Sequence, residues 1–515
     1  MAEKRIVHAV RNASWSFIGR FVMIGNTFLV KTVMIHTMGA EYLGVNSLFT
    51  SVLRILSLAE LGFTSAIVYS MYKPIAFHDT DMVCALLKLF RKIYWYIGSS
   101  ILLLGIGTLP FLNKLVSGTT PDDTDFHLIF CIYLMNTVCS YWFGGYKGVI
   151  LIAQQRNDIA AKISLRMELA KGGFQMLVLL LFRNYYLYAA ALPVSTIITN
   201  LITARMADRF FPQYVCRGQV DKECRKEIIK KAKALLAVKI TALIYNSVDS
   251  IVISGFLGLV ALAKYNNYYF VMNSVAGILT AIYGSVQSSV GNSIVLETPE
   301  KNYRDYRNLS YINAWLVGWC TVCLFCLYQP FIRIWAGEEF VLDRNIMICF
   351  CIYFYVHQLK TVQSTYKDAA GLWREDLWRS YCANLFNLVT NVILIQKIGL
   401  YGVLISTILA LLVITYPWQT RMLHKKLFQC SMAPFIKSLL EYAAATAGAC
   451  VLTEWVCSIC SWEGIGELLG RGILCIIVPN CLFLLLSLKR EEFAVLKKTL
   501  KNMAASLKEG RNEKR

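Results

Sequence analysis

Fourteen apolar runs, most of them long enough to cross a bilayer, constrain the fold of this 515-residue chain more than any other feature. A transmembrane helix needs about 20 mainly apolar residues, because each adds about 1.5 Å and the hydrocarbon core is about 30 Å thick. With 57% hydrophobic and 16% charged residues, the composition is that of a polytopic membrane protein. We therefore predict an all-α polytopic membrane protein with about 14 transmembrane helices and no soluble domain. The runs lie at 13–36, 42–72, 84–112, 126–153, 160–183, 186–212, 232–257, 265–295, 308–335, 344–366, 377–397, 400–422, 434–457 and 467–488.

The formal net charge of +20 bears on topology rather than on nucleic acid. A nucleic-acid-binding protein carries its basic surface on a folded soluble module, whereas here the basic residues lie between apolar runs. Most of the 52 Lys and Arg residues fall in or beside alternate connecting segments, beginning with the N-terminus. The positive-inside rule then places both termini in the cytoplasm. We expect no nucleic-acid partner.

The first two runs carry charged residues well inside them. Arg20 and Lys31 are eleven residues apart. At 100° per residue Thr27 and Lys31 fall within about 20° of Arg20, so the helix carries a cationic stripe. In the second run Arg54 shares a face with several Ser and Thr residues, and Glu60 lies about a third of a turn away. A charge at the centre of a helix in lipid costs about 2.5–3.5 kcal/mol, so we expect these residues to face a polar interior.

The run at 160–183 adds Lys171, for which two interpretations stay open. Glu168 and Gln175 lie within about 60° of it on a helix. Lys171 either adds to a cationic interior or is neutralised by Glu168 at the i, i+3 spacing.

The seventh and eighth runs supply acidic and aromatic groups. Asp249, with Asn246 nearby on the helix, either faces a cavity, as a gating pair or a coupling-ion site, or forms a structural salt bridge. Tyr265, Asn266 and Tyr269 combine ring faces and amides suited to sugars. The alternative is an interfacial aromatic belt.

Two motifs imitate metal sites. Cys320, Cys323 and Cys326 lie in a continuous apolar run without a nearby histidine, so we expect them to pack as small apolar residues. Asp123 and Asp125 resemble the D-x-D motif of glycosyltransferases. They stand in a short external loop before the fourth run, where Asp residues favour the start of a helix. We predict no metal site.

The connecting segments suggest a division of the chain. We predict an N-terminal lobe at 1–215, a basic cytoplasmic linker helix at 216–231, a C-terminal lobe at 232–423, two further helices at 424–489 and a basic amphipathic cytoplasmic tail at 490–515. The linker either lies on anionic lipid headgroups, with residues such as Ile228 toward lipid, or is an ordinary positive-inside loop.

Several stretches resemble one family, the polysaccharide transporters of the multidrug/oligosaccharidyl-lipid/polysaccharide (MOP) superfamily, which includes Wzx-type flippases. The likeness covers the whole chain in the number and orientation of spans, and is local in sequence. The stretches are Arg11-Asn12-Ala13-Ser14-Trp15, Tyr42-Leu43-Gly44-Val45-Asn46-Ser47-Leu48-Phe49, Leu56-Ser57-Leu58-Ala59-Glu60-Leu61-Gly62-Phe63, Tyr72-Lys73-Pro74-Ile75-Ala76 and Asn246-Ser247-Val248-Asp249-Ser250-Ile251-Val252-Ile253-Ser254.

The resemblance implies two six-helix lobes around a central cavity, with two extra C-terminal helices. It implies a flippase that moves a polyprenyl-diphosphate-linked oligosaccharide across the bacterial cytoplasmic membrane by alternating access. Expected partners are this lipid-linked substrate, anionic lipids, and the polymerase and glycosyltransferases of the same pathway. On this basis Arg20, Lys31, Arg54 and Lys171 contact diphosphate, Asn46, Asn246, Tyr265, Asn266 and Tyr269 contact sugar, and Glu60 and Asp249 serve gating or coupling.

Two other function classes remain. A cation-coupled multidrug antiporter of the same superfamily would share the fold, but we expect carboxylates to dominate its interior. A membrane enzyme would need clustered catalytic groups, and the six histidines form no cluster in the sequence. The sequence has no G-x-x-x-x-G-K-[S/T] loop, so we expect neither ATP-driven transport nor a cofactor.

Overall fold

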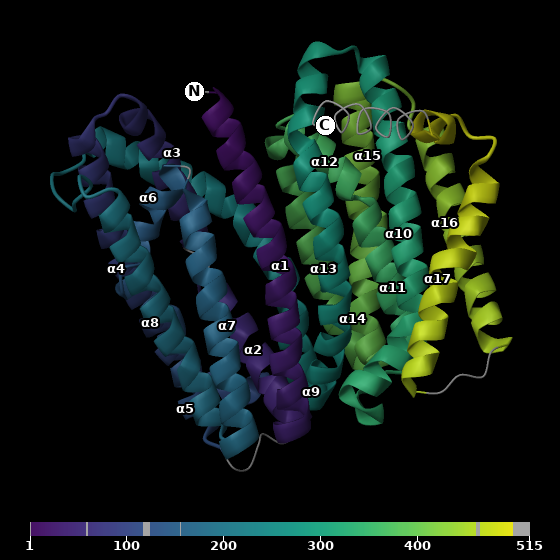
Figure 1. The fold of residues 1–515 in the computed structure, drawn as a ribbon, viewed down its shortest axis with the longest axis horizontal. Helices are drawn as coiled ribbons and strands as arrows, with labels where there is room; N and C mark the ends of the chain where they lie inside the picture. Colours follow the sequence, from purple (N-terminus) through teal and green to yellow (C-terminus); the bar gives the residue numbers. More distant parts are fainter. Residues whose placement is uncertain (1, 58–59, 117–123, 155, 460–463, 498–515) are drawn as a thin grey trace, which may run out of the picture. The chain divides into compact units, whose positions relative to one another are not determined.

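The structure is a computed structural model that describes residues 2–57, 60–116, 124–154, 156–459 and 464–497. Every regular element in these ranges is a helix, as Figure 1 shows. Within the same ranges eight helices are long and apolar enough to cross a membrane, or nine if the bent pair α5–α6 counts as one span. The predicted all-α polytopic fold class is therefore confirmed.

The chain divides into two compact units, unit 1 (Met1–Lys264) and unit 2 (Tyr265–Arg515). The elements of unit 1 are α1 (Ala2–Met38), α2 (Ala40–Leu56), α3 (Glu60–Ala76), α4 (Thr80–Thr108), η2 (Leu109–Leu115), α5 (Phe126–Trp142), η3 (Gly145–Lys147), α6 (Gly148–Ala153), α7 (Asn157–Phe182), α8 (Tyr185–Phe210) and the first part of α9 (Lys222–Leu296).

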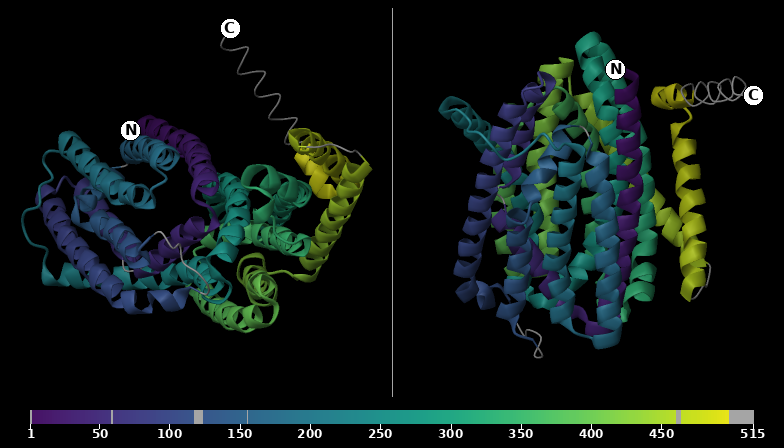
Figure 2. Two further views of the ribbon diagram at one scale, coloured as in Figure 1. Left: turned by 90° about the horizontal axis from the view of Figure 1, so that it is seen from below. Right: turned by 60° about the vertical axis from the view of Figure 1, so that its left-hand side comes forward.

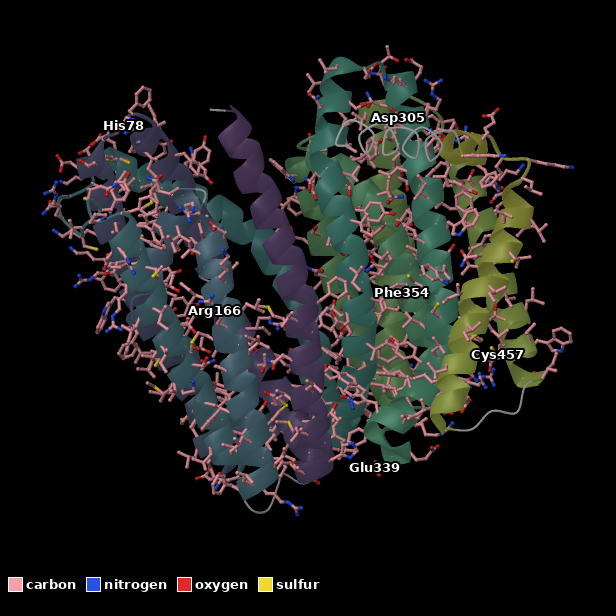
Figure 3. All side chains as sticks on the ribbon, in the orientation of Figure 1. His78, Arg166, Asp305, Glu339, Phe354 and Cys457 are labelled. Atoms are coloured by element: carbon pink, nitrogen blue, oxygen red, sulfur yellow. The ribbon has the colours of Figure 1, made fainter. Side chains whose placement is uncertain are left out.

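Unit 2 begins within α9 and contains the remaining helices. They are α10 (Pro299–Ala336), η4 (Glu338–Phe340), α11 (Arg344–Leu359), α12 (Thr361–Ala369), α13 (Trp373–Ile398), α14 (Leu400–Leu409), η5 (Ala410–Thr415), α15 (Tyr416–Leu423), η6 (His424–Phe428), α16 (Ala433–Ile459) and α17 (Gly464–Ser487). Asp305 and Glu339, labelled in Figure 3, mark opposite ends of this unit.

The first part of α9 packs within unit 1. A Cβ at Gly44 of α2 would lie 2.3 Å from the carbonyl oxygen of Leu259, so α2 and α9 touch backbone to backbone. Ser254 donates a hydrogen bond to the carbonyl of Leu115 at 2.8 Å. The helix is interrupted at Gly258, whose φ of 85° favours glycine. The unit boundary thus follows residue 264, whereas the sequence places the lobe boundary at the 216–231 linker; the lobe division stays a prediction.

The predicted spans differ in how regular they are. The run 42–72 is divided between α2 and α3, and 344–366 between α11 and α12. The runs 160–183 and 377–397 are helical but carry charged or amide side chains, so α7 and α13 fall outside the group of eight. Most side chains of the run 232–257 lie outside the described part of the chain.

Acidic and amide side chains start several helices of unit 1. The carboxylate of Asp125 accepts hydrogen bonds from the backbone N–H groups of His127 (2.9 Å) and Leu128 (3.2 Å), which caps α5. The predicted role of Asp125 in helix initiation is confirmed. Asp123, the other half of the D-x-D motif, lies outside the described residues.

In unit 2, α16 and α17 lie side by side and pack on α10 (Figures 1 and 2). Cys326 of α10 belongs to an apolar core cluster with Cys450 of α16 and Cys475 of α17, and Cys323 packs against it. Packing was the predicted role of these thiols. No group of His, Cys, Asp or Glu residues suited to a metal ion occurs among the described residues.

The contact between α1 and α7 depends on one glycine. Asn26 of α1 is 6% exposed and donates a hydrogen bond from its amide to the carbonyl of Glu168 on α7, at 3.1 Å. A Cβ at Gly172 would lie 2.3 Å from the amide oxygen of Asn26, whereas a Cβ at Gly173 would meet nothing within 4 Å. Gly172 therefore lets α1 approach α7 closely.

This geometry predicts opposite effects for two neighbouring substitutions. Gly172→Ala should displace Asn26 and lower the stability of the purified protein by about 1–3 kcal/mol, the usual cost of overpacking. Gly173→Ala should be neutral or slightly stabilising, since Ala favours a helix more than Gly. Thermal unfolding in detergent compares the two. Equal midpoints would contradict the close contact.

Candidate functional site

The predicted cations of the first two spans all fall in unit 1. Lys31 is half-buried on α1, and Arg54 is exposed in the last turn of α2. The side chains of Arg20, Glu60 and Asn246 lie outside the described part of the chain. Their assigned roles therefore stay predictions.

Lys171 is paired with Glu168. The ammonium lies 2.7 Å from a carboxylate oxygen of Glu168, at the i, i+3 spacing of α7, and the two side chains are 18% and 34% exposed. Of the two interpretations left open by the sequence, neutralisation is the one that the structure shows. Lys171 does not contribute an uncompensated charge.

This ion pair lines a pocket of about 240 Å³ between α5, α7 and α8, here called the polar pocket of unit 1. Its other walls are mostly uncharged polar side chains. Thr196 donates a hydrogen bond to Asn136 at 2.7 Å, and the amide of Asn200 donates to the carbonyl of Ser140 at 3.1 Å. The pocket is polar with no net formal charge, so it suits neutral hydrogen-bonding groups better than a free cation. The lining residues are Asn136, Ser164, Met167, Glu168, Lys171, Leu192, Ser195, Thr196, Thr199 and Asn200.

Asn46 is already hydrogen-bonded within unit 1. The hydroxyl of Tyr133 donates to its amide oxygen at 2.7 Å and lies 3.0 Å from the hydroxyl of Tyr185. Tyr185 in turn donates to the carbonyl of Tyr42 at 3.4 Å. The network links α2, α5 and α8. A sugar at Asn46 would use the amide nitrogen or the remaining lone pair of the amide oxygen, or would displace Tyr133.

Asp249 is 9% exposed on the first part of α9. Its neighbours Ser247, Ser250 and Ser254 are buried as well, at 0%, 7% and 0% exposure. The polar side chains of this stretch of α9 are therefore largely buried.

The aromatic and amide group of span eight begins unit 2. Tyr265 and Tyr269 are stacked, with ring centroids 5.9 Å apart and planes at 14°. Tyr265 is only 2% exposed and also packs on Phe350, so it belongs to the core. Asn266 is half-buried, and its amide nitrogen has no hydrogen-bond partner among the described residues. Asn267, from the same run of tyrosines and asparagines, is fully buried, and neither of its amide atoms has a hydrogen-bond partner among the described residues.

Unit 2 also holds a buried ionic cluster that the sequence analysis missed. Asp376, at the start of α13, is 4% exposed. Arg379 donates two hydrogen bonds to its carboxylate, at 2.5 and 2.8 Å, and Lys367 of α12 lies 3.4 Å away. Arg379 also reaches Thr415 at 3.2 Å, while Gln419 donates to Asp376 at 3.4 Å. The i, i+3 spacing of Asp376 and Arg379 was visible in the sequence, but their partners on η5 and α15 were not.

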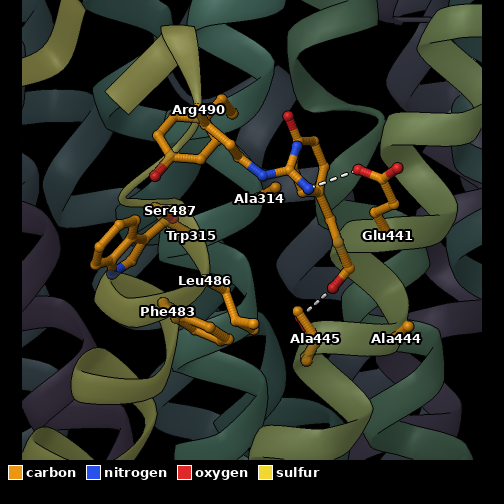
Figure 4. A pocket seen from close by; sticks show the side chains of 12 residues that line it. Ala314, Trp315, Glu441, Ala444, Ala445, Phe483, Leu486, Ser487 and Arg490 are labelled. Carbon is orange, nitrogen blue, oxygen red and sulfur yellow. Dashed lines mark hydrogen bonds and ion pairs between the residues drawn. The ribbon is translucent and has the colours of Figure 1, made fainter. Parts of the chain in front are cut away.

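Unit 2 contains a pocket of about 340 Å³ between α10, α16 and α17 (Figure 4). Its walls are mainly apolar, with Trp315, Phe483 and Leu486 among them. At its rim Arg490 forms an ion pair with Glu441 at 2.6 Å and lies over the ring of Tyr442, 5.0 Å from the centroid. The charges compensate each other, so the pocket favours an apolar group.

Comparison with known proteins finds likeness at the level of structure alone. No protein-family model and no curated protein sequence matches the chain. The lipid II flippase MurJ, in an inward closed conformation, aligns with a TM-score of 0.68 at 13% identity, covering 94% of this chain and 99% of the flippase. An inward-facing multidrug resistance MATE family transporter of the MOP superfamily aligns with a TM-score of 0.59 at 15% identity, covering 80% and 99%. The chain has the fold of MOP-superfamily transporters.

An outward-facing MATE transporter of the same superfamily aligns more weakly, with a TM-score of 0.51 at 16% identity over 82% of this chain and 97% of that one. The MOP fold confirms the predicted fold class and makes the chain a multi-pass membrane protein. Of the polar positions above, Lys31, Asp249 and Asn266 lie in helices long and apolar enough to cross a membrane, where such groups are costly unless they are paired or face water.

The Asp376 cluster generates a stability prediction. Asp376→Asn removes the charge that compensates Arg379 and Lys367, so it should destabilise unit 2 by about 3–5 kcal/mol. Asp368→Asn is the control, because Asp368 pairs with the same Lys367 at 2.9 Å but is 37% exposed, and its loss should cost no more than about 1 kcal/mol.

Thermal unfolding and expression level of the two variants measure the difference. A double variant, Asp376→Asn with Arg379→Met, should recover part of the loss, since it removes the stranded charge. If Asp376→Asn unfolds like the wild type, the cluster is not a stabilising element.

Proposed function

We propose that this protein is a flippase that translocates a polyprenyl-diphosphate-linked oligosaccharide across a bacterial cytoplasmic membrane. The observation that carries the proposal is the set of fixed cations within the first two membrane segments, of which Lys31 is half-buried on α1 and Arg54 exposed on α2. A cation inside a membrane helix is expensive and is retained where it meets an anion or water. A diphosphate is such an anion, and charge-assisted hydrogen bonds hold it strongly.

The extent of the structural likeness supports this choice. The MATE structures align over 97–99% of their own length yet cover only 80–82% of this chain. The MurJ structure covers 94% of it. This chain therefore contains helical structure beyond the MATE alignment that the flippase shares. MurJ is described as a lipid II flippase, and a lipid-linked oligosaccharide belongs to the same chemical class.

The alternative is a cation-coupled multidrug antiporter, since MATE transporters have the same fold. A binding site for cationic drugs or for coupling ions needs an excess of carboxylates. In the polar pocket of unit 1, Glu168 is the single lining carboxylate and is neutralised by Lys171 at 2.7 Å. This neutrality favours the flippase over the antiporter.

In the proposed mechanism the aqueous interior spares polar sugars the cost of crossing hydrocarbon, and the lipid tail stays in the bilayer. Arg20, Lys31 and Arg54 attract the diphosphate. Asn246, Asn266 and Tyr269, with Asn46 and Tyr265 after local rearrangement, contact sugar, and Glu60 or Asp249 serves gating or ion coupling. Both termini are cytoplasmic, and the polymerase and glycosyltransferases of the pathway act beside the transporter, which is itself no enzyme.

Deletion of the gene in its native host tests the function directly. Without the protein, a polyprenyl-diphosphate oligosaccharide should accumulate on the inner leaflet, and the wild-type chain should relieve this accumulation. A chain with Lys31→Ala and Arg54→Ala should relieve it at least tenfold less well, because two charge-assisted contacts to the diphosphate are lost. Extraction of membrane lipids followed by mass spectrometry measures the effect.

The control variant is Arg333→Ala, which removes a cation that is exposed and paired with Glu338 at 2.6 Å. It should transport like the wild type. Export of hydrophobic cations from the same strains tests the antiporter. If the deletion strain accumulates no lipid-linked oligosaccharide but loses the export of hydrophobic cations, the antiporter proposal would replace the flippase proposal.

A further inference from the structure

A groove of about 570 Å³ runs between α4 and the beginning of α9, entirely within unit 1. Its rim carries three cations, Lys88 and Lys92 from α4 and Arg225 from α9, and its floor is apolar. Neither the proposed transport function nor the predicted site residues involve these side chains. The combination of a basic rim and an apolar floor is that of a site for an amphiphilic anion.

The groove has a fixed frame, because the connection between α8 and α9 is held against the start of α4. Arg217 forms an ion pair with Asp81 at 2.8 Å. The backbone N–H of Val215 donates to the sulfur of Cys84 at 3.3 Å. Gly218 has a φ of 78°, a conformation that favours glycine, and its Cβ position lies 3.3 Å from the side chain of Ala85. These contacts place the first turns of α9 beside α4.

The apolar side chains at the floor of the groove pack within the protein and do not face the bilayer. Ile228 is 1% exposed, so the prediction that it faces lipid is wrong. It packs inside unit 1 because the α8–α9 connection turns α9 back toward α4. Ile97 on the α4 side is 7% exposed. The isoleucines of the groove that an acyl chain can contact are the half-buried ones, Ile93 of α4 and Ile229 of α9.

The three cations are available to a ligand. Lys92 and Arg225 are exposed and Lys88 is half-buried, and none of them forms an ion pair with another described residue. Lys88 and Lys92 are one helical turn apart on α4 and point to the same side. The 29 residues of α4 span about 44 Å, more than the hydrocarbon thickness of about 30 Å, so both lysines can lie at headgroup depth.

We propose that this groove binds an anionic glycerophospholipid, with its phosphate between Lys88, Lys92 and Arg225 and the start of an acyl chain along Ile93 and Ile229. A free anion would not need the apolar floor, and a neutral lipid would not need three cations. The lipid would join α4 to the connection from which α9 begins. The proposal rests on the geometry of unit 1 alone and does not depend on the transported substrate.

Lipid titration of the purified full-length protein, followed by native mass spectrometry, tests the site. Phosphatidylglycerol should bind more tightly than phosphatidylcholine. A variant with Lys88→Gln, Lys92→Gln and Arg225→Gln should lose this preference. Its affinity for phosphatidylglycerol should fall about fivefold for each cation removed. Glycerol phosphate, which has the anion but no chain, should compete only weakly.

The matched control removes three cations from the same segments but from outside the groove, by Arg91→Gln, Lys222→Gln and Lys226→Gln. It should keep the preference for phosphatidylglycerol. If the control loses as much as the groove variant, or if both lipids bind the wild type equally, the site does not exist. Should the triple variant fail to fold, the single charge reversal Lys92→Glu replaces it, and unchanged phosphatidylglycerol binding by that variant would overturn the proposal.

Discussion

In hydrocarbon no water is available to the backbone or to a charged side chain, so each must find its partner within the protein. The helices of both units satisfy the backbone groups through hydrogen bonds within each helix. The need of a buried charged side chain for a partner explains the ion pairs of this chain. Lys171 reaches Glu168 one turn away on α7, and Asp376 is held by Arg379 and Lys367. Because removing one partner of such a pair is strongly destabilising, these pairs hold their helices in place.

The same constraint separates structural charges from those that the proposed function needs. The pocket beside Lys171 is polar and formally neutral, because its one carboxylate meets its one ammonium. A flippase for an anionic headgroup can tolerate such a pocket and uses cations elsewhere, on α1 and α2. An antiporter for cations would leave a carboxylate available. The electrostatic difference between the two functions therefore lies in individual pairs on one shared fold.

Unit 1 shows how local contacts shape a membrane protein beyond helix packing. Gly172 brings α1 against α7, and Gly44 brings α2 against α9. The α8–α9 connection is held at the start of α4 by Arg217, Asp81 and Cys84. This frame creates a basic groove with an apolar floor, a suitable place for an anionic lipid to act on the helix that leads from unit 1 into unit 2.

The sequence by itself determined the fold class and the packing role of Cys323 and Cys326, because apolar length and helical periodicity are local properties. It also indicated the cap at Asp125, which involves residues three apart or fewer, whereas the structure decided between the two interpretations of Lys171 by placing its ammonium 2.7 Å from Glu168. Only the tertiary structure decided which distant groups meet. Tyr133 binds Asn46 across 87 positions, and Thr415 and Gln419 reach the Asp376 cluster from η5 and α15. Ile228 is buried because the α8–α9 connection turns α9 onto α4, a helix more than 100 positions earlier in the sequence, and no periodicity of α9 alone could show that.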